Sequence, residues 1–295
     1  MRCKRVMSIV EKSNIERFKK QVLGEWTNLA VAAAYRRWGY HEVVTFQGLT
    51  EVIVKAAQLK PNMKVIDLAS GSGEPAFALA KVVGQGGHVT ATDLGAELIA
   101  IAEESAQEQG LTNMSFCQAD AHALPFPDQT FDRVTARLGV TYFADSEQAL
   151  SECHRVLKPD GRVIFIVWGP PLKQGFMTST IRILMKYVKM PEDEPGAPTP
   201  FRFAEAGTLS AALQTVGFKQ VKEEYISIDA HFPGSPEEFW QYFVDMAPPF
   251  RPVIDTLQSD QRELAIEEVL ATLRQMYDGQ YVNIPTVVVL ASGVR

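Results

Sequence analysis

The chain has 295 residues, of which 46% are hydrophobic and 22% are charged, the balance of an ordinary globular protein. Its 29 basic and 35 acidic residues give a formal net charge of −6, and no basic block predicts a nucleic-acid surface. Three widely spaced cysteines (Cys3, Cys117 and Cys153) exclude a disulfide framework or a cysteine zinc site. The longest apolar run, 163–168, is far too short to cross a bilayer. We therefore expect a soluble, cytoplasmic protein with no bound metal, no nucleic-acid partner and no membrane span.

Apolar spacing predicts alternating helices and strands through the first part of the chain. In order, we expect one or two helices in 9–36, a helix from 49 to 57, a strand over 64–68, a helix over 75–83, a strand over 88–92, a helix over 97–109, strands over 114–118 and 131–136, a helix over 146–157, a turn over 158–161 and a strand over 162–168. Pro75 fits the first helical position, where its missing N–H costs nothing. The alternation predicts a doubly wound, mostly parallel α/β sheet whose ligand site lies at the carboxyl ends of its strands.

The second half of the chain has a less regular pattern of helices and strands. It predicts a helix over 176–190, a loop over 191–200, a helix over 208–216, a strand over 221–229, helices over 236–246 and 260–277, and a strand over 286–291. The stretches 176–190 and 239–243 are rich in methionine and aromatic residues, which suits either ordinary core or the lining of an apolar pocket.

The turn after the first predicted strand, 67–76, reads Asp-Leu-Ala-Ser-Gly-Ser-Gly-Glu-Pro-Ala. Small residues before a helix start let the backbone approach an anionic or polar ligand closely. The spacing of Gly71, Gly73 and the acidic Asp93 satisfies the dinucleotide fingerprint, which fits nicotinamide dehydrogenases and adenosyl-cofactor enzymes alike. Asp67 favours the second class because a carboxylate there suits a cationic ligand. Asp120, directly after the third strand, can accept a hydrogen bond from an adenine amine.

Four ordered motifs carry a resemblance to a known family. They are VIDLASGSGEPAFALA, the strand end ATD at 91–93, QADAHALPFPDQTFD and HRVLKPDGRVIFIVW. Together they resemble the class I S-adenosylmethionine-dependent methyltransferases, above all the small-molecule branch that includes the ubiquinone/menaquinone biosynthesis C-methyltransferases. The resemblance covers roughly residues 45–170. One departure is that Ala69 stands where the family usually has the first of three glycines, although a residue this small should still admit the cofactor.

The resemblance implies a Rossmann-like fold that binds S-adenosylmethionine and releases S-adenosylhomocysteine. It predicts an N-terminal helical cap over 1–48 and a cofactor-binding core over 49–170. Helices in 171–205 and 234–280 would cover the substrate, and 206–233 and 281–295 would complete the core.

The resemblance also implies a set of cofactor contacts at the strand ends, namely Asp67, Ala69, Ser70, Gly71, Gly73, Asp93, Leu94, Asp120, Ala121, His122, Arg137 and Leu138. Asp93 would take both ribose hydroxyls and Asp120 the adenine amine. Asp67 and the backbone of 69–73 would hold the methionine end. Arg137 would pair with the methionine carboxylate or with an acidic group of the substrate.

The methyl acceptor is left open by the sequence. Tyr142, Met177 and Trp240 are expected in its pocket, and His41 and Tyr35 are weak candidates for a base. We expect in-line transfer to carbon, oxygen or nitrogen of a small, partly apolar molecule such as a quinol, polyketide, terpenoid or aromatic metabolite. A nicotinamide-dependent oxidoreductase and a non-catalytic S-adenosylmethionine-binding protein are the alternatives. The chain is expected to be a monomer or a homodimer.

Overall fold

The computed structural model describes residues 9–189, 194 and 196–295, with side chains from residue 12 onward. Cys3 and residues 191–193 and 195 of the expected loop 191–200 lie outside these residues. Within the described ranges, one sheet holds the strands β1 Lys64–Leu68, β2 His88–Asp93, β3 Met114–Gln118, β4 Phe131–Arg137, β5 Leu157–Trp168, β6 Lys219–Pro233 and β7 Tyr281–Val294. Their order across the sheet is β3-β2-β1-β4-β5-β7-β6. β1 to β5 run parallel, whereas β7 runs antiparallel to both β5 and β6.

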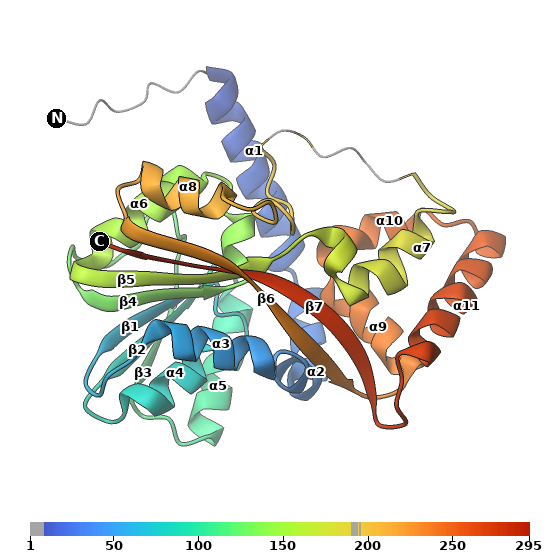
Figure 1. Ribbon diagram of the computed structural model, residues 1–295, viewed down its shortest axis with the longest axis horizontal. Coiled ribbons are helices and arrows are strands. Elements are labelled where there is room, and N and C mark those ends of the chain that lie inside the picture. The colour runs from blue at the N-terminus through green and yellow to red at the C-terminus, as the bar shows by residue number, and fades with distance from the viewer. Residues whose placement is uncertain (1–8, 190–193, 195) are drawn as a thin grey trace.

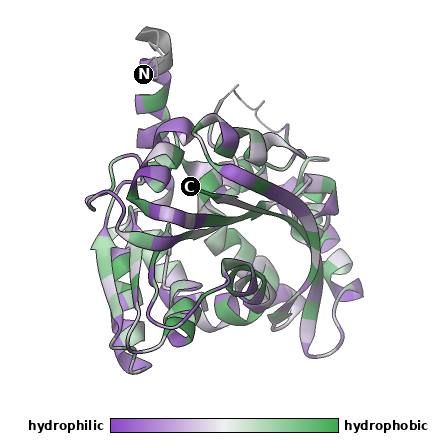
Figure 2. Ribbon diagram, turned by 60° about the vertical axis from the view of Figure 1, so that its left-hand side comes forward, coloured by the Kyte–Doolittle hydropathy of each residue, from purple (hydrophilic) through white to green (hydrophobic). Residues whose placement is uncertain are grey.

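Helices cover both faces of this sheet (Figure 1). On one face lie α3 Gln47–Ala57, α4 Ala76–Val83 and α5 Ala96–Glu108, and on the other lie α6 Ser146–Val156 and α8 Thr208–Thr215. Buried side chains such as Ile53 and Leu79 fill the first layer, and Leu150 and Leu213 fill the second. Figure 2 shows the central strands largely hydrophobic and the outer turns more hydrophilic. The predicted doubly wound, mostly parallel fold is confirmed.

A second group of helices lies beyond the carboxyl ends of the parallel strands. It comprises α1 Ile9–Trp26, α2 Leu29–Thr45, α7 Arg182–Leu184, α9 Pro236–Met246, α10 Arg251–Asp255 and α11 Ser259–Gln275. The long strands β6 and β7 curve out of the sheet to reach it (Figure 1). Phe232 of β6 and Phe239 of α9 are both buried in the cluster that joins α2, α9 and α11. Within the described part of the chain, no helix is both long and apolar enough to cross a membrane.

Four details differ from the sequence prediction. Pro75 is the N-cap of α4 rather than its first helical residue. The expected turn at 158–161 belongs to β5, where the register to β4 shifts and Asp160 takes a φ of 61°. β6 and β7 extend several residues beyond their predicted ends because they pair with each other outside the central sheet. The expected helix over 176–190 is instead a π-helix, Met177–Ile181, followed by the three-residue α7.

Candidate active site

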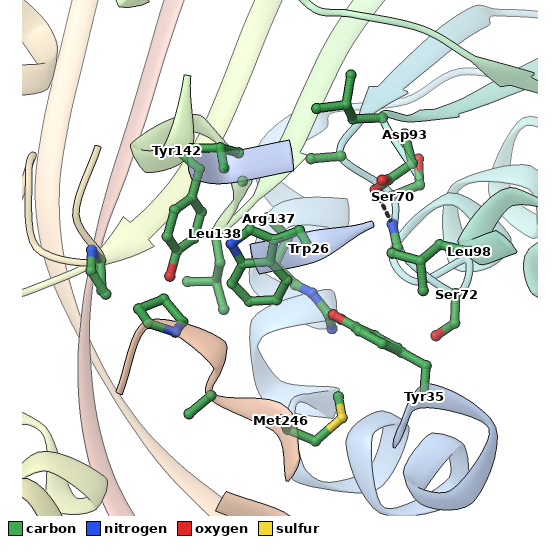
Figure 3. A pocket seen from close by; sticks show the side chains of 18 of the residues that line it. Trp26, Tyr35, Ser70, Ser72, Asp93, Leu98, Arg137, Leu138, Tyr142 and Met246 are labelled. Carbon is green, nitrogen blue, oxygen red and sulfur yellow. Dashed lines mark hydrogen bonds between the residues drawn. The ribbon is translucent and has the colours of Figure 1, made fainter. Parts of the chain in front are cut away.

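A cavity of about 490 Å³ opens at the carboxyl ends of β1, β2 and β4, beneath α1, α2 and α9. Its size falls within the range usual for small-molecule sites. Figure 3 shows Ser70, Ser72 and Asp93 on one side of it and Tyr142 and Met246 on the other. We call the first side the polar end and the second the aromatic end.

The glycine turn forms the floor of the polar end, where Ala69, Ser70 and Gly71 line the cavity. Gly71 has a φ of 53°, and a Cβ there would lie 3.5 Å from the ring of Tyr35, so this backbone is covered by α2. Gly73 plays a different part and does not line the cavity. A Cβ on it would lie 1.9 Å from Cζ of Phe77, so its lack of a side chain lets the start of α4 pack against the turn.

Asp67 lies behind the turn rather than in the cavity, which corrects the expected contact with the methionine end. Its side chain is fully buried, and its Oδ1 accepts a hydrogen bond of 2.5 Å from Thr135 Oγ1. Its Oδ2 has no partner in the described structure. Burial raises the pKa of Asp67 to about 7, and the hydrogen bond from Thr135 opposes this rise.

Asp93 ends β2 and lines the polar end. Its Oδ2 accepts the Gly71 N–H at 2.9 Å, and its Oδ1 accepts the Gly95 N–H at 2.9 Å. These bonds fix the carboxylate beside the glycine turn, although burial raises its pKa. Each carboxylate oxygen can accept a second hydrogen bond, so the side chain can still bind a ligand diol.

Asp120 and His122 form a linked pair in the segment after β3, next to Ala121, and all three line the cavity. His122 Nδ1 contacts Asp120 Oδ1, while its Nε2 accepts the Asp145 N–H at 3.0 Å. The second bond requires an unprotonated Nε2, so the network assigns His122 as the neutral Nδ1–H tautomer. Burial tends to raise the pKa of Asp120, but the hydrogen bonds from His122 outweigh it and hold the value at about 2. Lys19 of α1 lies 3.7 Å from Asp120 Oδ2.

Arg137 ends β4 at the boundary between the two ends of the cavity, as Figure 3 shows. Its Nη1 donates to Thr50 Oγ1 at 3.0 Å, and its guanidinium lies 5.7 Å from the ring centre of Phe46. Its Nη2 lies 3.8 Å from Glu42 Oε1. Glu42 Oε2 in turn accepts a hydrogen bond of 2.5 Å from the Tyr242 hydroxyl. The sequence analysis did not single out Glu42 or Tyr242.

The two candidate bases on α2 face different ways. Tyr35 lines the cavity, and its hydroxyl points toward Arg137 in Figure 3. His41 does not line it and instead stacks on Phe232, with ring centres 5.1 Å apart. Its Nδ1 is buried and has no partner among the described residues. Burial also lowers the pKa of His41. Residues seven apart share a helix face, so the spacing from Tyr35 is the feature by which the sequence could have indicated Glu42 instead of His41.

The aromatic end is built from side chains of β5, the π-helix region, α9 and η4 (Pro248–Phe250). The cavity lining there includes Trp168, Phe176, Phe239, Tyr242, Phe243, Met246 and Phe250. Tyr142 lines the cavity as expected, and so do Leu94 and Leu138. Met177 and Trp240 do not, because they pack into the cluster behind the wall while adjacent residues face the cavity. The predicted helix was correct for Trp240, which lies in α9, but in both segments the residue that faces the cavity is one position earlier, Phe176 and Phe239.

The strand order and the polar turn at its rim define a class, the Rossmann-like methyltransferases. The YcgJ protein of Bacillus subtilis matches with a TM-score of 0.54 and 23% identity, over 83% of this chain and 97% of that one. Phosphoethanolamine N-methyltransferase 2 of Haemonchus contortus, solved in complex with S-adenosyl-L-methionine, matches with a TM-score of 0.53 and 16% identity, over 99% of this chain and 61% of that one. At these identities the two likenesses establish the fold alone.

Residues 42–193 match the model of the ubiE/COQ5 methyltransferase family, and the chain belongs to that family. The ubiquinone/menaquinone biosynthesis C-methyltransferase UbiE of Pectobacterium carotovorum is 34% identical over 126 residues, which cover 42% of this chain and 50% of that protein. The chain thus spans about half the length of the curated relatives it matches first. The family resemblance stated from the sequence motifs is confirmed, and with it S-adenosylmethionine as the cofactor of the family.

Proposed function

We propose that this protein transfers a methyl group from S-adenosylmethionine to a small, partly apolar acceptor with a ring system. The observation that carries the proposal is the continuity of the cavity, which joins a polar end at the glycine turn to an aromatic end under α9. A cofactor and an acceptor can therefore lie in contact inside one continuous cavity. The family membership and the name of the UbiE relative support a quinol-like acceptor.

The residues of the polar end suit the cofactor. We propose that Asp93 binds the ribose diol, that Asp120 and Ala121 contact the adenine, and that the backbone of 69–71 approaches the methionine end. Glu74 takes the place first expected for Asp67, because it lines the cavity and its Oε2 is buried without a partner in the described structure. A carboxylate at that point suits the ammonium group of the methionine end.

S-adenosylmethionine supplies an electrophilic methyl group on a sulfonium centre. The protein's task is then to align the acceptor with that methyl group and to exclude water. Trp26 of α1 packs against Tyr142 with ring centres 5.1 Å apart, and both line the cavity. This contact closes one side of the site. We accordingly retain the division into a cap over 1–48, a core over 49–170, 206–233 and 281–295, and covering helices over 171–205 and 234–280.

The remaining parts of the proposal concern partners and location. The net charge of −6 supports the absence of a nucleic-acid partner, and we propose a cytoplasmic monomer or homodimer. The nicotinamide alternative loses its support, because the glycine pattern that allowed it belongs here to a methyltransferase family. A non-catalytic S-adenosylmethionine-binding protein is the alternative that experiment must separate.

The test is methyl transfer from methyl-labelled S-adenosylmethionine to a prenylated 1,4-naphthohydroquinone kept reduced. The proposal predicts label on the naphthohydroquinone with the wild-type protein and at least about tenfold less with Asp93→Ala, at the same cofactor concentration held below the wild-type Kd. Binding of S-adenosylmethionine without transfer to this probe or to simpler hydroxylated aromatics would favour the non-catalytic alternative.

A further inference from the structure

We propose that Glu42 takes the hydroxyl proton of the methyl acceptor, with Tyr242 and Arg137 holding its carboxylate at the boundary of the polar and aromatic ends. This inference rests on the proposed function and deepens it, because it assigns the proton acceptor for the reaction. Glu42 comes from α2, Tyr242 from α9 and Arg137 from β4. The three side chains line the cavity together.

The two carboxylate oxygens of Glu42 have different surroundings. Oε2 accepts the Tyr242 hydroxyl at 2.5 Å. Oε1 lies 3.8 Å from Arg137 Nη2, which is beyond the length of an N–H···O hydrogen bond. Among the described residues, Oε1 therefore has a charge partner but no hydrogen-bond donor. That oxygen is available to accept a hydrogen bond, and then a proton, from a ligand in the cavity.

The burial of Glu42 makes its carboxylate more basic than that of an exposed glutamate. Its side chain is 12% exposed and that of Arg137 is 7% exposed. Burial raises the pKa of Glu42, while Arg137 and the hydrogen bond from Tyr242 oppose the rise. Tyr35 is also titratable and lines the same cavity, and burial raises the pKa of both Tyr35 and Tyr242, so both hydroxyls stay protonated. A carboxylate with a raised pKa is a stronger base than an ordinary glutamate.

Other groups that could take a proton are placed less well. Both ring nitrogens of His122 are occupied, and His41 lies outside the cavity lining. Among the described residues, the remaining carboxylates of the lining lie on α1 or at the polar end, namely Glu16, Glu74, Asp93 and Asp120. Glu42 differs from these because its hydrogen-bond partner, Tyr242, is part of the aromatic wall.

The proton transfer balances. The O–H bond of the acceptor breaks, and its proton forms a bond with Glu42 Oε1. The electron pair left on the acceptor forms the new bond to the methyl carbon as the carbon–sulfur bond breaks, and the sulfonium becomes a neutral sulfide. Arg137 keeps its charge throughout, and Glu42 returns the proton to solvent after the product leaves.

The test compares the pH dependence of kcat/KM, from about pH 5 to 9, for the prenylated naphthohydroquinone with wild type, Glu42→Gln and Tyr242→Phe. We expect Glu42→Gln to lower kcat/KM about 100-fold or more at pH 7. We also expect it to abolish the acidic limb of the pH profile, which is the fall of kcat/KM at low pH. We expect Tyr242→Phe to keep activity but to move that limb to higher pH, because the carboxylate loses a hydrogen bond that favours its charged form. Glu51→Gln, on the exposed side of α3, is the matched control and should behave as wild type.

Calorimetric binding of S-adenosylhomocysteine checks that each variant is folded, and its Kd should stay within about twofold of wild type. If the wild type transfers methyl and Glu42→Gln keeps the wild-type rate and acidic limb, the inference is overturned while the proposed function stands. An unmoved limb in Tyr242→Phe would also overturn it. If the wild type itself transfers no methyl to the probe, the proposed function fails and this inference fails with it.

Discussion

At the scale of single residues, the structure explains why this chain tolerates Ala69 in its glycine turn. Ala69 adopts a φ of 51°, a conformation that costs an L-residue about 1–2 kcal/mol relative to glycine. A Cβ built on Gly139 would lie only 2.3 Å from the Ala69 Cβ. Gly139, in the loop after β4, therefore provides the space that the alanine methyl group occupies. The departure from the usual family turn is matched by a glycine about 70 residues away.

This pairing predicts that Gly139→Ala lowers the free energy of unfolding by about 1–3 kcal/mol, because the new methyl group collides with Ala69. Adding Ala69→Gly should restore most of the loss, since the remaining Cα lies 3.7 Å away, an ordinary contact. Urea unfolding of the two single variants and the double variant measures the coupling. A double variant no more stable than Gly139→Ala alone would show that the two positions do not compensate each other.

The sequence analysis was correct for site residues that lie at the ends of strands. Asp93 and Arg137 end parallel strands and Asp120 lies two residues after one, and parallel topology brings such residues to one rim. Glu42 was missed because its role depends on α9, which lies about 200 residues away and contributes Tyr242. Neither residue carries a local motif, so their meeting follows only from the tertiary structure.

At the scale of elements, polar contacts attach α2 to α9 over the cavity. Trp38 Nε1 donates to Asp245 Oδ2 at 2.8 Å, and Arg37 pairs with the same oxygen at 3.3 Å. The Trp38 side chain is buried, so its indole N–H has little access to water. The junction thus combines apolar packing with two hydrogen bonds, from Trp38 to Asp245 and from Tyr242 to Glu42.

We predict that Asp245→Ala lowers the free energy of unfolding by about 1–3 kcal/mol, because it leaves a buried indole N–H without an acceptor. Asp255→Ala is the matched control, since Asp255 forms an exposed pair with Arg251 and its loss should cost no more than about 1 kcal/mol. Chemical denaturation of both variants gives the comparison. Equal effects for the two would contradict the account of this junction.

Elements with clear periodicity and turn residues were predicted to within a residue or two, as for β1, β3 and α9. The segment 176–190 was not predicted correctly, and its polar residues explain why it does not form one regular α-helix. Thr178 Oγ1 donates to Gln174 O at 3.2 Å, and Thr180 Oγ1 donates to Phe176 O. Such back-bonding to the preceding turn bends helices, and here it accompanies a π-helix. The spacing of apolar residues alone gives no information about this competition between threonine hydroxyl groups and backbone N–H groups for the same carbonyl oxygens.

At the scale of the whole molecule, the βαβ alternation was enough to predict a mostly parallel sheet with one ligand-binding rim. The placement of β7 between β5 and β6 was not predictable in this way, because it depends on pairings across long sequence separations, such as Tyr225 with Val289. That pairing carries β6 and β7 beyond the sheet, and α9, which lies between them in sequence, forms part of the cavity wall. The aromatic end therefore arises from tertiary structure that no local pattern encodes.

The measurement that tests this account most directly is calorimetric binding of S-adenosylhomocysteine to the wild type and to Asp93→Ala, with NADH as the control ligand. The account predicts micromolar binding of S-adenosylhomocysteine, no binding of NADH, and a loss of about tenfold or more in Asp93→Ala, because two charged hydrogen bonds to the ribose disappear. Binding of NADH instead, or S-adenosylhomocysteine affinity unchanged in Asp93→Ala, would contradict the assignment of the polar end to the cofactor.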